Sequence, residues 1–253
     1  MSFLRDLFGK KPASPFDSQL PQSPEESVGT PKRAFGAKSG TLVDPRDGQT
    51  YRTVKIGDDI WMAENLRTSL FLDGSPIPKL QYCAIHEARS AASPYADDLE
   101  NAESYGLLYS WHAIVDSRGL CPEGWHIPSD QEWQALEARV GFRWDHSGDM
   151  WQGMDQGNLL KETGTTHWLA PNNGSNRIGF SARPGGYFDN LTGEYKGIQD
   201  IANFWSTMSH NSSSAYMRRL CGANGKILRG SSLKSGGLSV RCVKGPLAAI
   251  PKW

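Results

Sequence analysis

The sequence predicts a mixed α+β domain with small antiparallel sheets, one or two helices and long loops, preceded by a disordered tail. The composition supports this, because the hydrophobic fraction is only 38% while the chain contains 9 Trp and 27 Gly. Such a chain builds its core from a few large aromatic side chains and joins short elements with loops. The β-rich segments are short and bounded by turn residues, and one segment carries complete helix signals.

Residues 1–39 have the composition of a disordered tail. Five prolines lie among Ser, Gln, Glu and Lys, and such a stretch buries too little apolar surface to offset its ordering entropy. Within it, the apolar residues of Phe3–Phe8 fall on one face of a short helix. This segment is either a docking peptide for a partner or membrane surface, or a frayed terminus. We therefore expect a tail at 1–39, a folded domain at 40–246 and a C-terminal extension at 247–253.

The folded domain is expected to begin with a β-hairpin. Tyr51–Ile56 and Ile60–Met62 are β-rich and are joined by the turn residues Gly57-Asp58-Asp59. Farther on, Tyr105–Val115 is strongly apolar and fits either a buried helix or a strand, since periodicity does not separate these for short runs. A short helix is also expected around His86–Ala92.

The clearest helix runs from Ser129 to Val140. Ser129 is an N-cap residue, and Glu132 stands at the capping-box position three residues later. Trp133, Leu136 and Val140 form one apolar face, and Gly141 follows as the stop signal.

The second half of the chain is expected to contain long loops and a few short strands. The predicted strands are Ile178–Ala182, Phe204–Ser206 and Ser239–Val243. We expect the core to include the large side chains of Trp125, Trp133 and Trp205.

Charge and hydropathy exclude several partner classes. Lys plus Arg and Asp plus Glu both number 27, which disfavours a nucleic-acid partner. No stretch approaches the ~20 apolar residues of a transmembrane helix. The first residues lack the apolar run of a secretory signal, which favours a cytoplasmic location without fixing it.

The sequence offers no catalytic or metal-binding motif. The six His stand apart, without metalloprotease or zinc spacing. The pair Asp97-Asp98 supplies few of the six to eight oxygens that calcium takes, so we expect no cofactor and find no support for a structural calcium. Cys83, Cys121, Cys221 and Cys242 are too widely spaced for a disulfide scaffold, and we interpret them as structural thiols; a Cys121–Cys242 disulfide would need an oxidising compartment.

Six ordered runs carry a family resemblance. They are YRTVKIGDDIWMAENL (Tyr51–Leu66), YGLLYSW (Tyr105–Trp111), CPEGWHIPSDQEW (Cys121–Trp133), GFSARPGGYFDNLTGEY (Gly179–Tyr195), FWST (Phe204–Thr207) and GGLSVRCVK (Gly236–Lys244). Together they resemble the Fibrobacter succinogenes major paralogous domain over about residues 41–245. That family is similar in fold to C-type-lectin-like domains and formylglycine-generating enzymes. The resemblance implies a compact α+β unit whose first and last strands lie together.

The candidate binding surface follows Trp205. Ser and Asn dominate this stretch, with Tyr216 nearby, a composition typical of recognition surfaces and also of ordinary polar loops. Domains of this kind also serve as variable proteins of diversity-generating retroelements, in which diversified side chains form a ligand-binding face. That resemblance places the face between about Asn203 and Lys234. The candidates are Asn203, Thr207, Ser209, His210, Asn211, Ser214, Tyr216, Arg218, Asn224 and Lys226.

Within this surface we expect Tyr216 and Arg218 to be the anchors. Tyr and Arg often dominate interface energy, and residues two apart on an extended chain face the same side. The sequence thus favours a module that binds a protein or a glycan. The alternatives are an enzyme related to formylglycine-generating enzymes, which needs a closely spaced reactive cysteine pair that Cys221 and Cys242 do not form, and a structural or assembly domain.

Overall fold

The computed structural model describes residues 38–82, 88–145 and 150–245. The chain divides into two units, Met1–Ala34 and Phe35–Trp253, and every described residue belongs to the second. The predicted tail up to residue 37, with its docking segment, and the C-terminal extension lie outside the described residues.

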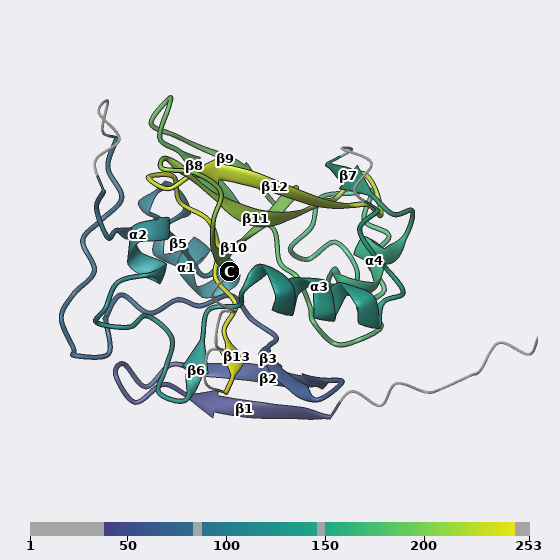
Figure 1. Cartoon of the computed structure of the whole chain (residues 1–253), viewed down its shortest axis with the longest axis horizontal. Coiled ribbons are helices and arrows are strands. Elements are labelled where there is room, and N and C mark those ends of the chain that lie inside the picture. Colours follow the sequence, from purple (N-terminus) through teal and green to yellow (C-terminus); the bar gives the residue numbers. More distant parts are fainter. Residues whose placement is uncertain (1–37, 83–87, 146–149, 246–253) are drawn as a thin grey trace, which may run out of the picture. The chain divides into compact units, whose positions relative to one another are not determined.

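The mixed α+β class is confirmed, and strands predominate (Figure 1). A five-stranded sheet has the order β1-β2-β3-β13-β6, with β1 Ser39–Val43, β2 Thr50–Ile56, β3 Asp59–Met62, β13 Val243–Lys244 and β6 Trp125–His126. A six-stranded sheet has the order β7-β12-β11-β10-β8-β9, with β7 Trp151–Gln152, β12 Ile227–Leu233, β11 Ser214–Cys221, β10 Ile201–Ser209, β8 Gly185–Asp189 and β9 Glu194–Ile198. A small sheet pairs β4 Ala92–Pro94 with β5 Leu107–Tyr109. The helices are the 3-10 turn η1 Tyr95–Asp97 and the α-helices α1 Leu99–Tyr105, α2 Trp111–Ile114, α3 Asp130–Arg139 and α4 Gln156–Leu160.

The expected hairpin at the start of the domain is confirmed. Strands β2 and β3 pair antiparallel, with Val54 opposite Trp61. The closing strand β13 pairs with β3 through Val243. The first and last strands therefore belong to one sheet, with β2 and β3 between them.

Helix α3 is formed as its capping signals predict. The Ser129 hydroxyl accepts a hydrogen bond from the Glu132 backbone N–H, and the Glu132 carboxylate accepts one from the Ser129 backbone N–H. Trp133 and Leu136 are buried on one side of the helix. Figure 1 shows α3 between the two larger sheets, so its apolar face helps to join them.

The apolar run Tyr105–Val115 contains both a strand and a helix. Strand β5 ends at Tyr109, and Ser110 then caps α2 by accepting a hydrogen bond from the Ala113 backbone N–H. The helix expected around His86–Ala92 falls partly on residues 83–87, which lie outside the described residues. Residues 88–91 form no helix, and Ala92 begins β4.

Two of the three strands predicted late in the chain differ from the structure. Ile178–Ala182 forms no strand, because Gly179 and Ser181 adopt positive φ angles of 79° and 52° that interrupt extended backbone. Ser239–Val243 contributes only Val243 to a strand, although Ser239 bridges to β10. Phe204–Ser206 lies inside β10, as expected.

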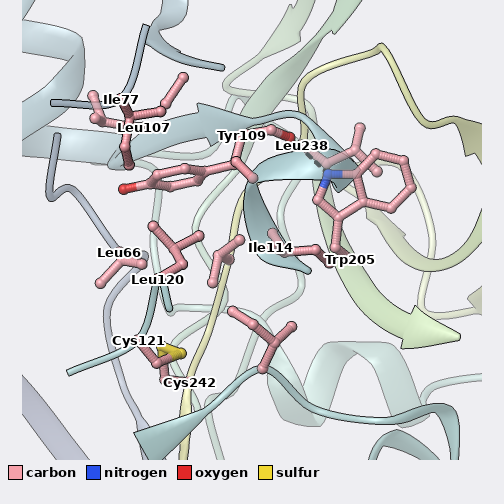
Figure 2. Close-up of a cluster of buried hydrophobic side chains, with 14 of the residues drawn as sticks. Leu66, Ile77, Leu107, Tyr109, Ile114, Leu120, Cys121, Trp205, Leu238 and Cys242 are labelled. Carbon is pink, nitrogen blue, oxygen red and sulfur yellow. Dashed lines mark hydrogen bonds between the residues drawn. A yellow bond between two sulfur atoms is a disulfide. The ribbon is translucent and has the colours of Figure 1, made fainter. Parts of the chain in front are cut away.

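The core contains large aromatic side chains, and two of the three tryptophans predicted to lie there are buried. Trp133 and Trp205 are almost fully buried, whereas Trp125 is half-buried at the edge of the five-stranded sheet, so its core placement is corrected. Figure 2 shows Trp205 beside Tyr109; its indole N–H donates to the Tyr109 carbonyl oxygen at 2.7 Å.

Two cysteines predicted as thiols form a disulfide. Cys121 and Cys242 are joined across 121 residues (Figure 2), because the closing segment before β13 runs beside the segment before β6. Cys221 is a free thiol. The reading of all four cysteines as unpaired is therefore wrong for Cys121 and Cys242.

The closing segment is also held by Arg241. This side chain is 1% exposed and donates hydrogen bonds to the Asn65 side-chain oxygen and to backbone carbonyls of Met62, Phe180 and Ser181. Four acceptors thus satisfy a buried guanidinium without a carboxylate. Arg241 binds the closing segment to β3 and to the loop before β8.

Candidate functional site

Strand β11 directs alternate side chains to opposite faces of the six-stranded sheet. Arg218 points toward α3, where it contacts Asp130 and Glu137. Because neighbouring strand residues face opposite ways, Arg219 points to the other side. We call the side that packs on α3 the helix-side face, and the opposite side the far face.

The helix-side face buries a complete ion-pair network. Arg218, 2% exposed, donates to Asp130 Oδ1 at 2.7 Å and to Glu137 Oε1 at 2.6 Å. Arg229 of β12 reaches the same Asp130 carboxylate, with Nη2 to Oδ2 at 3.0 Å. The Trp144 indole N–H donates to the second Glu137 oxygen at 2.7 Å. Every charge here has a partner, so the network joins β11 and β12 to α3.

The two carboxyls of this network shift their pKa in opposite directions. Burial raises the pKa of both groups. At Asp130 the two guanidiniums of Arg218 and Arg229 outweigh burial, so its pKa falls below the usual value. Glu137 is more deeply buried and pairs with Arg218 alone, so its pKa rises.

Tyr216 lies on the helix-side face, nearer the end of the sheet. The Arg229 guanidinium lies 4.1 Å from the Tyr216 ring centre, and the His210 ring packs edge-on at 5.0 Å. Since Asp130 fixes Arg229, Tyr216 rests on a preformed support. Its ring is half-buried, so part of the ring is accessible to solvent.

A single row of side chains crosses the far face. Cross-strand pairing places Trp151 opposite Leu228, Leu228 opposite Arg219, and Arg219 opposite Asn203. Residues opposite one another share a face. Strands β10 and β8 run parallel with Ala202 beside Gly186, and the Arg219 guanidinium lies 5.4 Å from the Tyr187 ring centre, which brings Tyr187 into the row. We call Trp151, Leu228, Arg219, Asn203 and Tyr187 the far-face row.

Arg219 is the charged member of the far-face row. Its Nε donates to the Asn203 side-chain oxygen at 2.7 Å, and within the part of the chain that the structure describes its guanidinium has no carboxylate at ion-pair distance. Burial lowers the pKa of Arg219, yet an arginine stays protonated at neutral pH. The far face thus holds a half-buried positive charge without a counter-charge.

Asn203 lies under this arginine and is fully buried. Because a guanidinium only donates, the Asn203 oxygen must face Arg219. The Asn203 Nδ2 group is then a buried donor with no hydrogen-bond partner among residues 38–82, 88–145 and 150–245. Such groups are rare and call for an explanation.

Two lysines near the six-stranded sheet are in different states. Lys196 of β9 stands opposite Tyr187 and is neutralised by Asp189 and Glu194 at 2.8 and 3.2 Å. Lys234 follows β12, lies 4.4 Å from the Trp111 ring centre, and donates to the carbonyls of the hairpin between β10 and β11. Of these cations, Arg219 has the most hydrogen-bonding capacity left.

Three of the predicted binding residues are buried, not exposed. Arg218 was expected at the surface with Tyr216, but it shares that face with α3, whose carboxylates bury it. Asn203 was expected at the surface and is buried beneath Arg219. Ser214 is also buried, at 9% exposure.

The remaining candidates fall into two separate groups. Thr207, Ser209, His210 and Asn211 lie at the hairpin between β10 and β11, while Asn224 and Lys226 lie at the turn between β11 and β12. These turns stand at opposite ends of β11, roughly 25 Å apart at about 3.3 Å per residue. Tyr216 contacts the hairpin group through His210, and the turn that holds Asn224 and Lys226 lies apart from that patch.

The sequence interpretation missed Arg219, Tyr187 and Trp151. The adjacent pair Arg218-Arg219 was an available signal, since one of two neighbouring strand residues must face away from the other. Their assignment to a face depends on where α3 packs. That is a long-range fact which no local pattern contains.

A cleft elsewhere is a weaker candidate. It has a volume of about 430 Å³ and lies between Leu80, Ser110 and Ser235. Two of its cations are paired with acids, Arg118 with Asp116 at 2.7 Å and Lys79 with Asp97 at 3.9 Å. Its charges are therefore largely satisfied within the protein.

The described residues show neither a metal-binding cluster nor a membrane-spanning helix. Among the described residues no group of three or more His, Cys, Asp or Glu is placed to hold a metal ion. Asp98, half of the pair considered for calcium, caps α1 by accepting from the Glu100 backbone N–H. No helix in the described ranges is long and apolar enough to cross a membrane.

Comparison with known proteins identifies one relationship. The family model described as the Fibrobacter succinogenes major domain matches residues 54–244. The match begins within β2 and ends at β13, so it contains the six-stranded sheet, α3 and the far-face row but not β1. No curated protein and no solved structure matches the chain.

Proposed function

The chain belongs to the Fibrobacter succinogenes major domain family, and from that premise we propose that it is a binding module with a C-type-lectin-like scaffold. Its ligand surface is the part of the far face around Arg219 and Tyr187, beyond the end of that face where Trp205 and Met217 are buried in the core. The proposal rests on one contrast. On the helix-side face the charged side chains form ion pairs with one another. On the far face the guanidinium of Arg219 has no ion-pair partner among the described residues and lies beside the Tyr187 ring.

The residue types on the far face suit recognition. Trp151, Arg219 and Tyr187 are half-buried, and Trp, Tyr and Arg are the residues that most often carry binding energy at interfaces. All three are placed on paired strands, which hold side chains more rigidly than loops do. A ligand would meet a preformed surface at little cost in ordering.

A diversity-generating retroelement would use this scaffold in a restricted way. Diversifying Arg218 would leave the buried Glu137 carboxylate without its ion-pair partner and would remove one of the two arginines that pair with Asp130. We therefore propose that diversified positions would be those of the far face that reach solvent, such as Arg219. A near-copy of the 3′ coding end that differs mainly at adenines, beside a reverse-transcriptase gene, is the expected observation. Flanking DNA without such a copy would contradict this part of the proposal.

The binding proposal is tested by selecting ligands directly. We would pan the purified full chain against a displayed peptide library and a glycan array, and then measure the affinity of each ligand for two variants. Tyr187→Ala alters the far face, and His210→Ala alters the hairpin. We expect selected ligands to lose about tenfold or more in affinity with Tyr187→Ala, the size of a typical aromatic anchor, and to keep it with His210→Ala.

Two results would contradict the far-face assignment. One is a set of ligands that bind Tyr187→Ala as well as the unaltered chain. The other is loss of binding with His210→Ala alone, which would return the surface to the hairpin. Melting curves of both variants establish that each is folded.

A further inference from the structure

The far-face row contains two hydrogen-bond donors aimed at no acceptor. The Arg219 guanidinium uses Nε for Asn203, and in the described part of the chain its two Nη groups make no hydrogen bond. The Asn203 Nδ2 group is buried and equally without a partner there. Donors alone, on neighbouring strands of one sheet face, fit a ligand that only accepts.

The arrangement of the free donors fits an anion that offers two oxygens as hydrogen-bond acceptors. A guanidinium presents parallel N–H groups that match the two oxygens of a carboxylate. The Tyr187 ring lies against Arg219 and the Asn203 oxygen holds its Nε, so the plane of the guanidinium is fixed. The side chain is therefore oriented before a ligand arrives, which reduces the entropy lost on binding.

The charges around the row favour an acidic ligand. Lys196 is neutralised by its own acids, but Arg219 is not, and Lys234 binds only carbonyl oxygens and the Trp111 ring. Arg219 is the one charged side chain of the far-face row, so the row itself carries a positive charge. A partner that brings a carboxylate supplies the missing counter-charge.

We propose that Arg219 and Asn203 form a carboxylate-binding site, and that it receives an acidic side chain of a partner protein. The site rests on the proposed function, since it names the ligand chemistry of the same face. A protein partner is favoured because Trp151 and Tyr187 flank the arginine, a combination enriched at protein interfaces.

The test uses small carboxylates on the full chain, so it needs no partner. The Nε–H resonance of Arg219 and the Nδ2 resonances of Asn203 are followed by NMR while sodium acetate replaces sodium chloride at constant ionic strength. We expect a saturable shift at both groups. The exposed Arg139, which has only a 3.9 Å contact with Asp58, serves as the internal control and should shift linearly.

Two variants separate the site from general charge effects. Arg219→Gln should weaken acetate binding about tenfold or more, as expected for loss of a charge-assisted hydrogen bond. Asn203→Asp keeps the arginine but places a carboxylate beside it, so it should abolish saturable binding through an internal ion pair. Acetate binding that survives both changes would overturn the site.

The source of the carboxylate is tested by comparing ligands. N-acetylglutamic acid α-amide represents a protein side chain, and glucuronate represents an acidic sugar. Equal or tighter binding of the amino-acid probe supports the proposal. Binding of glucuronate about tenfold tighter would overturn the protein partner, and a similar preference for inorganic phosphate would overturn the carboxylate.

Failure here differs from failure of the binding proposal. If acetate never gives a saturable shift, the carboxylate site is wrong. The far-face binding proposal is then still tested by the affinity of the selected peptides or glycans for Tyr187→Ala. If acetate binds but selected ligands ignore Tyr187→Ala, the site stands and the far-face module is wrong.

Discussion

Arg218 and Arg219 are neighbours on one strand, yet they face different environments. Arg218 meets two buried carboxylates on the helix-side face, and Arg219 meets an amide oxygen and a tyrosine ring on the far face. The first arginine therefore belongs to the fold, because its charge is satisfied within it. The second keeps hydrogen-bonding capacity that a ligand could use, which suggests that charge pairing, more than residue type or exposure, separates structural from binding arginines in this sheet.

The largest expected effect comes from removing the structural arginine. Arg218→Met leaves Asp130 and Glu137 with a buried negative charge that has lost a partner. Breaking a buried pair in this way costs about 3–5 kcal/mol of unfolding free energy. Urea unfolding followed by tryptophan fluorescence measures it.

A double variant sharpens this result. The double variant Arg218→Met/Glu137→Gln also removes the negative charge of Glu137, which the single change leaves without an ion-pair partner. Asp130 keeps its pair with Arg229. Part of the lost stability should return. No recovery would indicate that Arg218 acts through packing alone.

The helix-side face should also respond to acid in a way that the far face does not. The Asp130 pKa is depressed in the folded state, so its contribution to stability is present above the unfolded pKa of about 4 and is lost as pH falls through the folded pKa. Glu137 acts in the opposite sense, since its folded pKa is raised.

Asp130→Asn tests this directly. The variant should be less stable at pH 7 and should lose less further stability than the unaltered chain between about pH 5 and 2. Arg219→Gln should leave the acid dependence unchanged, because no carboxyl in the described residues pairs with Arg219. An equal acid slope in Asp130→Asn and the unaltered chain would show that other carboxyls dominate.

How much of this could be read from the sequence depends on the range of each contact. The capping box of α3 was predictable because Ser129 and Glu132 are three residues apart. The hairpin of β2 and β3 was predictable from its turn. In contrast, Arg218 finds Asp130 across 88 positions and Glu137 across 81.

The same reasoning explains the misplaced site. Alternation correctly put Tyr216 and Arg218 on one side of β11, but nothing local shows that α3 covers the Arg218 end of that side. The sequence named Cys121–Cys242 as a pair but left its disulfide state open for the same reason, since sheet order brings the two cysteines together. Local signals defined elements, and the burial of each face followed from their packing.

The binding arginine should be nearly neutral for stability. Arg219→Gln removes a half-buried charge that has no counter-charge, and the new amide can still donate toward the Asn203 oxygen. We expect the unfolding free energy to change by no more than about 1 kcal/mol. Urea unfolding beside Arg218→Met makes a matched pair, and equal destabilisation of the two variants would break the comparison.

The smallest effect is expected at Lys234, which tests whether an unpaired charge alone makes a binding residue. Its Nζ already donates to the carbonyl oxygens of Asn211 and Ser212 and lies over Trp111. Most of its hydrogen-bonding capacity is therefore used to hold the hairpin. Lys234→Gln should lower the unfolding free energy by less than about 1 kcal/mol, the size of an exposed cation–π contact, and should change acetate affinity at Arg219 by less than about twofold through weak screened electrostatics. A loss as large as that of Arg219→Gln would mean that the positive field of the face binds the anion, and not the arranged donors of Arg219 and Asn203.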